Sequence, residues 1–284
     1  MLPGVIKSVS QKHGENTAYV SADARKITYS DLDRTSDEMA VWLTQKGIGE
    51  RSVAALCLPS CIEYIISYLA LAKIGSITAG INPRFTSHER ADALETLNPD
   101  IVITTKGSDA GVETKYPKTV IALNQTDLMH SHRIKDSYPQ SLDEDDNRPV
   151  CICFTSGSSG KPKGALFTNK QLKAISDLDI GGSWGGGGHR YASTEFAHVG
   201  VMTKLPWLLA TAGTTHLLEK WNAAEILNLI NDYKMTSVSA IAPQIALMLK
   251  QENIQELDFA SVKAIVTGGA FASADLIRKG REIF

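Results

Sequence analysis

The sequence has few of the residues that form metal centres or disulfide frameworks. Its 284 residues include four cysteines, which lie in apolar runs and form no CxxC pair: Cys57, Cys61, Cys151 and Cys153. Buried, reduced thiols are therefore expected rather than disulfides or a cysteine-bound metal. The seven histidines form no HExxH pattern, so the sequence predicts no metal site.

An excess of charge of one sign is also lacking. The formal net charge is −2 and the pI is about 6.4. Without a basic excess or a polybasic run, nucleic acid and a membrane surface are not expected partners. The amino terminus has no basic stretch followed by an apolar core, so no signal peptide is evident and a cytoplasmic location is expected. The apolar span over 61–81 contains Glu63 and Lys73, which favours a buried helix and strand over a membrane span.

Strand and helix patterns alternate along the chain. Strands are expected at 27–29, 53–58, 76–79, 101–104, 120–123, 191–196, 213–218, 237–242 and 262–267. Helices are expected between Ser30 and Gly47, over 62–74, 87–97, 169–176, 201–210, 221–233 and 244–250, and after Ser273. This alternation predicts an α/β fold with doubly wound, mostly parallel sheets. We expect two βα subdomains, 1–149 and 150–284, the second incomplete.

The segment from Cys151 to Thr168, CICFTSGSSGKPKGALFT, has the most distinctive chemistry. Its apolar runs, 150–154 and 165–167, predict two strands joined by a loop. Glycines in the loop allow successive backbone N–H groups to face one concavity that can hold an anion. The Ser and Thr hydroxyls add hydrogen-bond donors, and Lys163 adds a positive charge, so the loop suits a polyphosphate. The loop is not a Walker A motif, because Lys161 precedes Pro162 and a strand follows rather than a helix. A flexible Gly/Ser turn is the alternative interpretation.

Ser156 to Gly164 resembles the phosphate loop of the adenylate-forming superfamily, which includes acyl- and aryl-CoA synthetases, adenylation domains of peptide synthetases and firefly luciferase. The resemblance continues at 27–32 and at Asn82-Pro83-Arg84, and it covers nearly the whole chain. It implies that a carboxylate attacks the α-phosphate of ATP with Mg²⁺, forming an acyl-adenylate and pyrophosphate. A thiol, expected to be CoA, then attacks the adenylate. The alternatives are an enzyme that loads a carrier protein and a non-catalytic nucleotide- or acyl-binding fragment.

The resemblance also implies roles for individual residues. Those expected to bind ATP are Thr155, Ser156, Gly157, Ser158, Ser159, Gly160 and Lys163 at the phosphates, and Gly268, Gly269 and Ala270 at the adenine. Those expected at the acid substrate are His198, Val199, Gly200, Ala242 and Pro243. His198 and Lys163 are the candidate catalytic residues. A packed histidine at a strand end and an ordinary Gly-Gly turn are the structural alternatives.

Two further features concern the substrate and the extent of the enzyme. Amino-acid-activating relatives carry Phe-Asp where this chain has Phe196-Ala197, so the expected acid has no free α-amino group. Asn169 and Glu195 depart from the family pattern. The family's later motifs, including the glutamate that holds Mg²⁺, are not found before Phe284. We therefore expect the N-terminal part of a longer enzyme, inactive or impaired by itself, with the principal Mg²⁺ ligand beyond residue 284.

Overall fold

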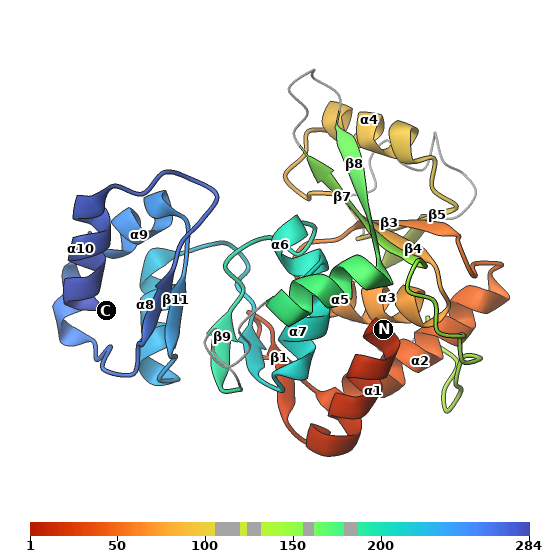
Figure 1. The fold of residues 1–284 in the computed structure, drawn as a ribbon, viewed down its shortest axis with the longest axis horizontal. Helices are drawn as coiled ribbons and strands as arrows, with labels where there is room; N and C mark the ends of the chain where they lie inside the picture. The colour runs from red at the N-terminus through yellow and green to blue at the C-terminus, as the bar shows by residue number, and fades with distance from the viewer. Residues whose placement is uncertain (106–119, 124–131, 156–161, 179–186) are drawn as a thin grey trace.

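A computed structural model describes residues 1–105, 120–123, 132–155, 162–178 and 187–284. Its largest sheet has six strands in the order β6-β5-β3-β4-β7-β8 (Figure 1). Neighbouring strands are parallel except for the antiparallel β7–β8 hairpin. The strands are β3 (Val53–Cys57), β4 (Ile77–Gly80), β5 (Ile101–Thr105), β6 (Val120–Leu123), β7 (Pro149–Thr155) and β8 (Lys163–Thr168).

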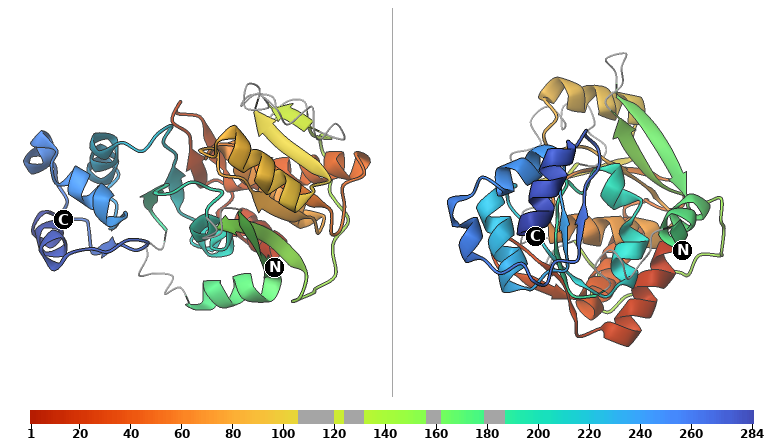
Figure 2. Two further views of the ribbon diagram at one scale, coloured as in Figure 1. Left: turned by 90° about the horizontal axis from the view of Figure 1, so that it is seen from above. Right: turned by 60° about the vertical axis from the view of Figure 1, so that its left-hand side comes forward.

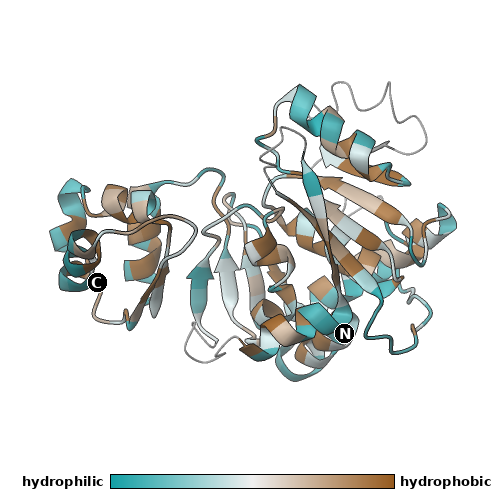
Figure 3. Cartoon of the chain, turned by 45° about the horizontal axis from the view of Figure 1, so that its top comes forward, coloured by the Kyte–Doolittle hydropathy of each residue, from teal (hydrophilic) through white to brown (hydrophobic). Residues whose placement is uncertain are grey.

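Helices cover both faces of this sheet. Strand β3 contributes to the core on each face, because successive side chains of a strand point to opposite sides. Ala54 and Leu56 of β3 pack into a core with the helices α1 (Leu2–His13), α2 (Tyr29–Gln45) and α3 (Ile62–Lys73). Ala55 and Cys57 pack on the other side with α4 (Ser87–Leu97). Figure 3 shows apolar residues concentrated on the central strands and the helices against them. The doubly wound arrangement predicted from the alternating pattern is confirmed.

Helix α3 is the apolar segment that could be mistaken for a membrane span. All its residues are buried, and its Lys73 lies 2.6 Å from Asp33 and 2.7 Å from Asp37 of α2. Glu63 pairs with Arg25 at 2.7 Å. The expectation of a buried helix and strand is confirmed. Across the described ranges, no helix is both long and apolar enough to cross a membrane.

A second sheet joins strands from distant parts of the chain, in the order β2-β1-β10-β9. Its strands are β1 (Thr17–Val20), β2 (Lys26–Thr28), β9 (His189–Tyr191) and β10 (Thr214–His216). The helices of this part of the chain are α5 (Asn169–Leu178), α6 (Val199–Met202) and α7 (Leu205–Ala210). Strand β1 pairs with β10, and β4 pairs with β7, so two sheets contain strands from both sides of residue 149. The division into subdomains 1–149 and 150–284 stays a prediction.

The C-terminal residues form a lobe that is set apart from the rest in two views (Figures 1 and 2). Its parallel strands are β11 (Ser237–Ser239) and β12 (Ala264–Val266). Its helices are α8 (Ala223–Asp232), α9 (Ala242–Met248), α10 (Ala274–Ile283) and the 3₁₀ helix η2 (Glu252–Glu256). A separate core holds the lobe together, with Ile226, Ile230 and Val238 at its centre.

Several expected element boundaries are wrong. The predicted strand 191–196 ends at Tyr191, and the predicted helix 201–210 is two short helices, α6 and α7. Ala242 and Pro243 open α9 instead of ending a strand, a place where proline is tolerated because the first turn needs no N–H donor. The cap of α2 is Thr28 rather than Ser30, since the Thr28 hydroxyl accepts from Asp31 N at 3.1 Å.

Candidate functional site

The β7–β8 hairpin holds the two ends of the predicted phosphate loop together. Thr155 is the register partner of Lys163, and its hydroxyl donates to the Lys163 carbonyl at 3.4 Å. Both residues are exposed. Thr155 lies at the carboxyl end of β7, the edge at which open α/β sheets bind ligands. Ser156, Gly157, Ser158, Ser159 and Gly160 lie outside the described residues, so their predicted role stays a prediction.

Helix α6 crosses close to this edge and carries His198 at its start. Met202 of α6 lies 3.9 Å from Cys153 of β7, measured between the sulfur atoms. The close packing depends on Gly80 at the end of β4. A Cβ atom there would lie 2.5 Å from Met202 Sδ and 2.8 Å from Ala197 Cα. A glycine at this point therefore lets the chain around His198 approach the strands.

His198 is an exposed N-cap residue rather than a buried core histidine. Its Nδ1 accepts a hydrogen bond from Gly200 N at 3.1 Å, which fixes the ring against the first turn of α6. Val199 is 41% exposed and Gly200 is partly exposed. His198, Val199 and Gly200 thus present a surface beside the sheet edge, where a ligand could reach them.

Three residues that the sequence did not mark as functional meet next to this surface. Glu195 accepts a hydrogen bond from Ser60 at 2.7 Å and pairs with Arg84 at 3.0 Å. In the sequence, Arg84 stands out only as part of the Asn82-Pro83-Arg84 resemblance, and Glu195 only as a departure from the family pattern. No local sequence pattern marks Ser60 as a site residue, because its hydrogen-bond partner Glu195 is 135 positions away in the sequence.

The predicted adenine-binding and acyl-pocket segments lie together in the C-terminal lobe. Gly268, Gly269 and Ala270 follow β12 and are exposed. A Cβ on Gly269 would lie 3.8 Å from Ile241, the residue before α9. Gly269 has φ +75°, a conformation that glycine adopts without strain. Ala242 is buried and Pro243 is exposed, and the roles of all five predicted residues stay predictions.

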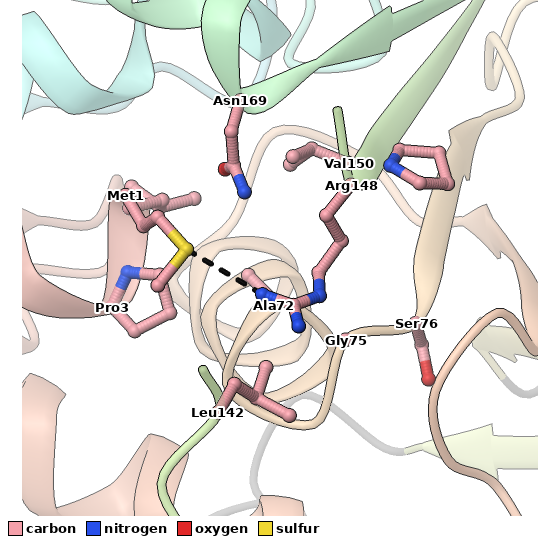
Figure 4. Close-up of a pocket in the computed structure, with 11 residues that line it drawn as sticks. Met1, Pro3, Ala72, Gly75, Ser76, Leu142, Arg148, Val150 and Asn169 are labelled. Carbon is pink, nitrogen blue, oxygen red and sulfur yellow. Dashed lines mark hydrogen bonds between the residues drawn. The ribbon is translucent and has the colours of Figure 1, made fainter. Parts of the chain in front are cut away.

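Two of the cavities formed by the described residues contain none of the predicted site residues. One of about 110 Å³ is at the carboxyl ends of β3, β4 and β5, lined by Cys57, Pro59, Ile81, Asn82, Pro83, Arg90 and Thr105. The other, in Figure 4, has a volume of only about 10 Å³. There the Arg148 guanidinium lies 3.5 Å from Met1 Sδ and donates to the Asp143 carbonyl at 2.7 Å. These contacts hold the amino terminus against the rest of the protein. Because the cavity has room for about one water molecule at most, we assign no ligand to it.

Two of the cysteines, Cys57 and Cys61, are not suited to nucleophilic chemistry. All four are buried and reduced, as predicted. Burial raises the pKa of Cys57 to about 12 and raises that of Cys61 further, so both thiols stay protonated at neutral pH. Within the described ranges, no three histidine, cysteine or acidic residues gather to hold a metal ion.

The described residues form a doubly wound α/β fold with the β7–β8 hairpin at one edge of its largest sheet. Residues 6–284 match the AMP-binding enzyme family, and the chain belongs to this family. It is 24% identical to 4-coumarate–CoA ligase 1 of Solanum tuberosum over 271 residues, which are 88% of this chain and 48% of the relative. It is also 24% identical to peroxisomal OPC-8:0-CoA ligase 1 of Arabidopsis thaliana, over 94% of this chain and 52% of the relative. The chain thus spans about half the length of these relatives.

Solved structures confirm the fold. The N-terminal domain of FACL13 from Mycobacterium tuberculosis matches 99% of this chain with a TM-score of 0.87 and 20% sequence identity, over 73% of its own length. The luciferase-like enzyme from Zophobas morio matches 100% of this chain with a TM-score of 0.86 and 18% identity, over 69% of its own length. The predicted resemblance to the N-terminal part of adenylate-forming enzymes is therefore confirmed.

Proposed function

We propose that this chain forms the N-terminal part of an ATP-dependent acid–thiol ligase that activates a carboxylic acid as an acyl-adenylate. The observation that carries the proposal is the pairing of Thr155 with Lys163 across the mouth of the Gly/Ser loop. This pairing sets a hydroxyl and an ammonium-bearing side chain at the carboxyl end of β7. Family membership and the CoA ligases among its relatives support the same reaction class.

The first step needs alignment and charge neutralisation more than covalent help from the protein. A substrate carboxylate oxygen bonds to the α-phosphorus of ATP, and the bond from that phosphorus to the bridging oxygen breaks to release pyrophosphate. Lys163 and the Thr155 hydroxyl stabilise the charge that develops on the leaving phosphates. Mg²⁺ would share this charge, and we assign it no ligand within the described part of the chain.

The second step transfers the acyl group to a thiol. The thiolate adds to the acyl carbon, and the bond from that carbon to the AMP oxygen breaks, so AMP leaves. His198 lies on the exposed start of α6, where it can orient the acid carboxylate. We take CoA as the acceptor because relatives of this chain are named as CoA ligases. Ala197 supports an acid without an α-ammonium group, since it offers no carboxylate to bind one.

The test is acid-dependent exchange between ATP and pyrophosphate over a panel of aryl, short, medium and long carboxylic acids. We expect exchange from a longer parent that includes this chain, with one class of acid preferred, and little or none from residues 1–284. A folded parent that exchanges with no acid contradicts the proposal. Adding free CoA or a phosphopantetheinylated carrier protein to the active parent identifies the acceptor, and thioester formation only on the carrier contradicts the CoA assignment.

A further inference from the structure

Glu195 joins three loops at the carboxyl edge of the large sheet. Its Oε2 accepts a hydrogen bond from the hydroxyl of Ser60, which follows β3, at 2.7 Å. Its Oε1 lies 3.0 Å from Nη2 of Arg84, which follows β4. One carboxylate therefore connects two sheet loops to the segment that leads into α6.

The backbone completes the connection to His198. Phe196 N donates to the Ser60 hydroxyl at 3.0 Å, so this hydroxyl both accepts from the segment and donates to Glu195. His198 N donates to the Glu195 carbonyl at 3.0 Å. Phe196 itself packs edge-on against Tyr64 and Tyr19, with ring centroids 5.7 and 6.2 Å away. The turn that ends in His198 is thus fixed on one side by packing and on the other by the carboxylate.

The energies of these contacts indicate a local role for the carboxylate. The side chain of Arg84 is 69% exposed and that of Glu195 is 25% exposed. Exposed ion pairs of this kind contribute about 0–1 kcal/mol to folding. The global stability therefore depends little on this pair. The reaction rate is more sensitive than the global stability to the position of a turn that faces a ligand. A displacement of about 1 Å in an active site can reduce the rate about 100-fold.

We propose that Glu195 is a positioning residue that acts through Ser60 and Arg84 to hold the His198 turn in place for the acid substrate. This inference rests on the proposed function. The carboxylate departs from the family's sequence pattern, so the inference concerns this chain in particular. His198 needs such support because it is exposed and caps a helix of only four residues.

The first measurement is hydrogen–deuterium exchange at the Phe196 amide in residues 1–284. Ser60→Ala removes the acceptor of this amide and serves as the positive control. Glu144→Ala replaces an exposed glutamate far along the chain and is the matched control. We expect Glu195→Ala to raise exchange at Phe196 about tenfold or more, because Ser60 loses the carboxylate that orients it. Exchange equal to that of Glu144→Ala overturns the proposal.

The second measurement is the kinetics of the longer parent. Glu195→Ala is expected to lower kcat for adenylation by about 10- to 100-fold while KM for ATP stays within twofold, since the hairpin is untouched. Glu195→Gln keeps an oxygen for Ser60 and should restore most of the rate. Equal losses in kcat and in ATP affinity, or no rescue by glutamine, contradict the positioning role. If the wild-type parent shows no exchange, the proposed function fails, and the amide measurement still decides whether Glu195 holds the turn.

Discussion

At the scale of single residues, Lys163 gives the most direct test of the phosphate loop. Lys163→Ala removes a charge from an exposed side chain at the start of β8, so the free energy of unfolding should change by less than about 0.5 kcal/mol. Exchange between ATP and pyrophosphate in the longer parent should fall by about 100-fold if the ammonium stabilises the leaving phosphates. Lys170→Ala removes another exposed lysine, on α5, and should leave exchange unchanged. Equal exchange activity in the two variants would contradict a role for Lys163 in binding the phosphates.

The sequence predicted one local contact of the candidate site and missed a distant one for a physical reason. The hairpin that pairs Thr155 with Lys163 was predictable because a short loop and its flanking strands make a local pattern, while the roles of both residues stay predictions. The contact between Ser60 and Glu195 was not predictable, because it joins residues 135 positions apart. A packed histidine at a strand end was the structural alternative for His198, but this residue is exposed and caps α6, since the chain leaves the sheet after Tyr191.

At the scale of elements, Gly80 controls how closely α6 packs on the sheet. In Gly80→Ala the new Cβ would lie 2.5 Å from Met202 Sδ and 2.8 Å from both Ala197 Cα and the Tyr64 hydroxyl. Because the Ala197 neighbour is backbone, relief requires the segment that leads into α6 to move, and overpacking of this kind costs about 1–3 kcal/mol. Urea unfolding should show this loss. Gly49→Ala is the matched control, since a Cβ there meets no atom within 4 Å. Equal stabilities would mean that α6 is not packed as described.

From residue 26 onward much of the order of elements followed from the sequence, whereas α1 and β1 were not predicted and strand pairing outside the β7–β8 hairpin was not indicated. Hydrophobic periodicity is local, so it predicted the strand at 53–58 and the helix at 62–74 within one residue of β3 and α3. Strand partners depend on contacts between distant segments, and no periodic pattern indicated that β7 pairs with β4 or that β1 pairs with β10. The predicted strand over 191–196 failed for a related reason, because Phe196 packs against Tyr64 instead of continuing a ladder.

At the scale of the whole molecule, a pair of histidines lies where the C-terminal lobe meets the second sheet. His189 Nδ1 of β9 is 2.9 Å from His216 Nε2 of β10. The ring of Tyr233, at the end of α8, lies 4.1 Å from the ring of His216 and 4.7 Å from that of His189, measured between centroids. Burial, His189 and Lys26 lower the pKa of His216 to about 4, and burial lowers that of His189.

These lowered pKa values make the stability of this joint depend on pH. Below the ordinary histidine pKa of about 6.5 the unfolded chain binds protons that the folded chain excludes, so stability falls as pH falls from about 6.5 towards 4. Allowing for solvent at the rings, the His216 contribution lost between pH 7 and pH 5 should be of order 1 kcal/mol. Urea unfolding at both pH values should show a smaller loss for His216→Gln than for the wild type. His13→Gln, which changes an exposed histidine on α1, should keep the wild-type loss. Equal losses in all three proteins would mean that acid acts on other groups and that the joint does not respond to pH.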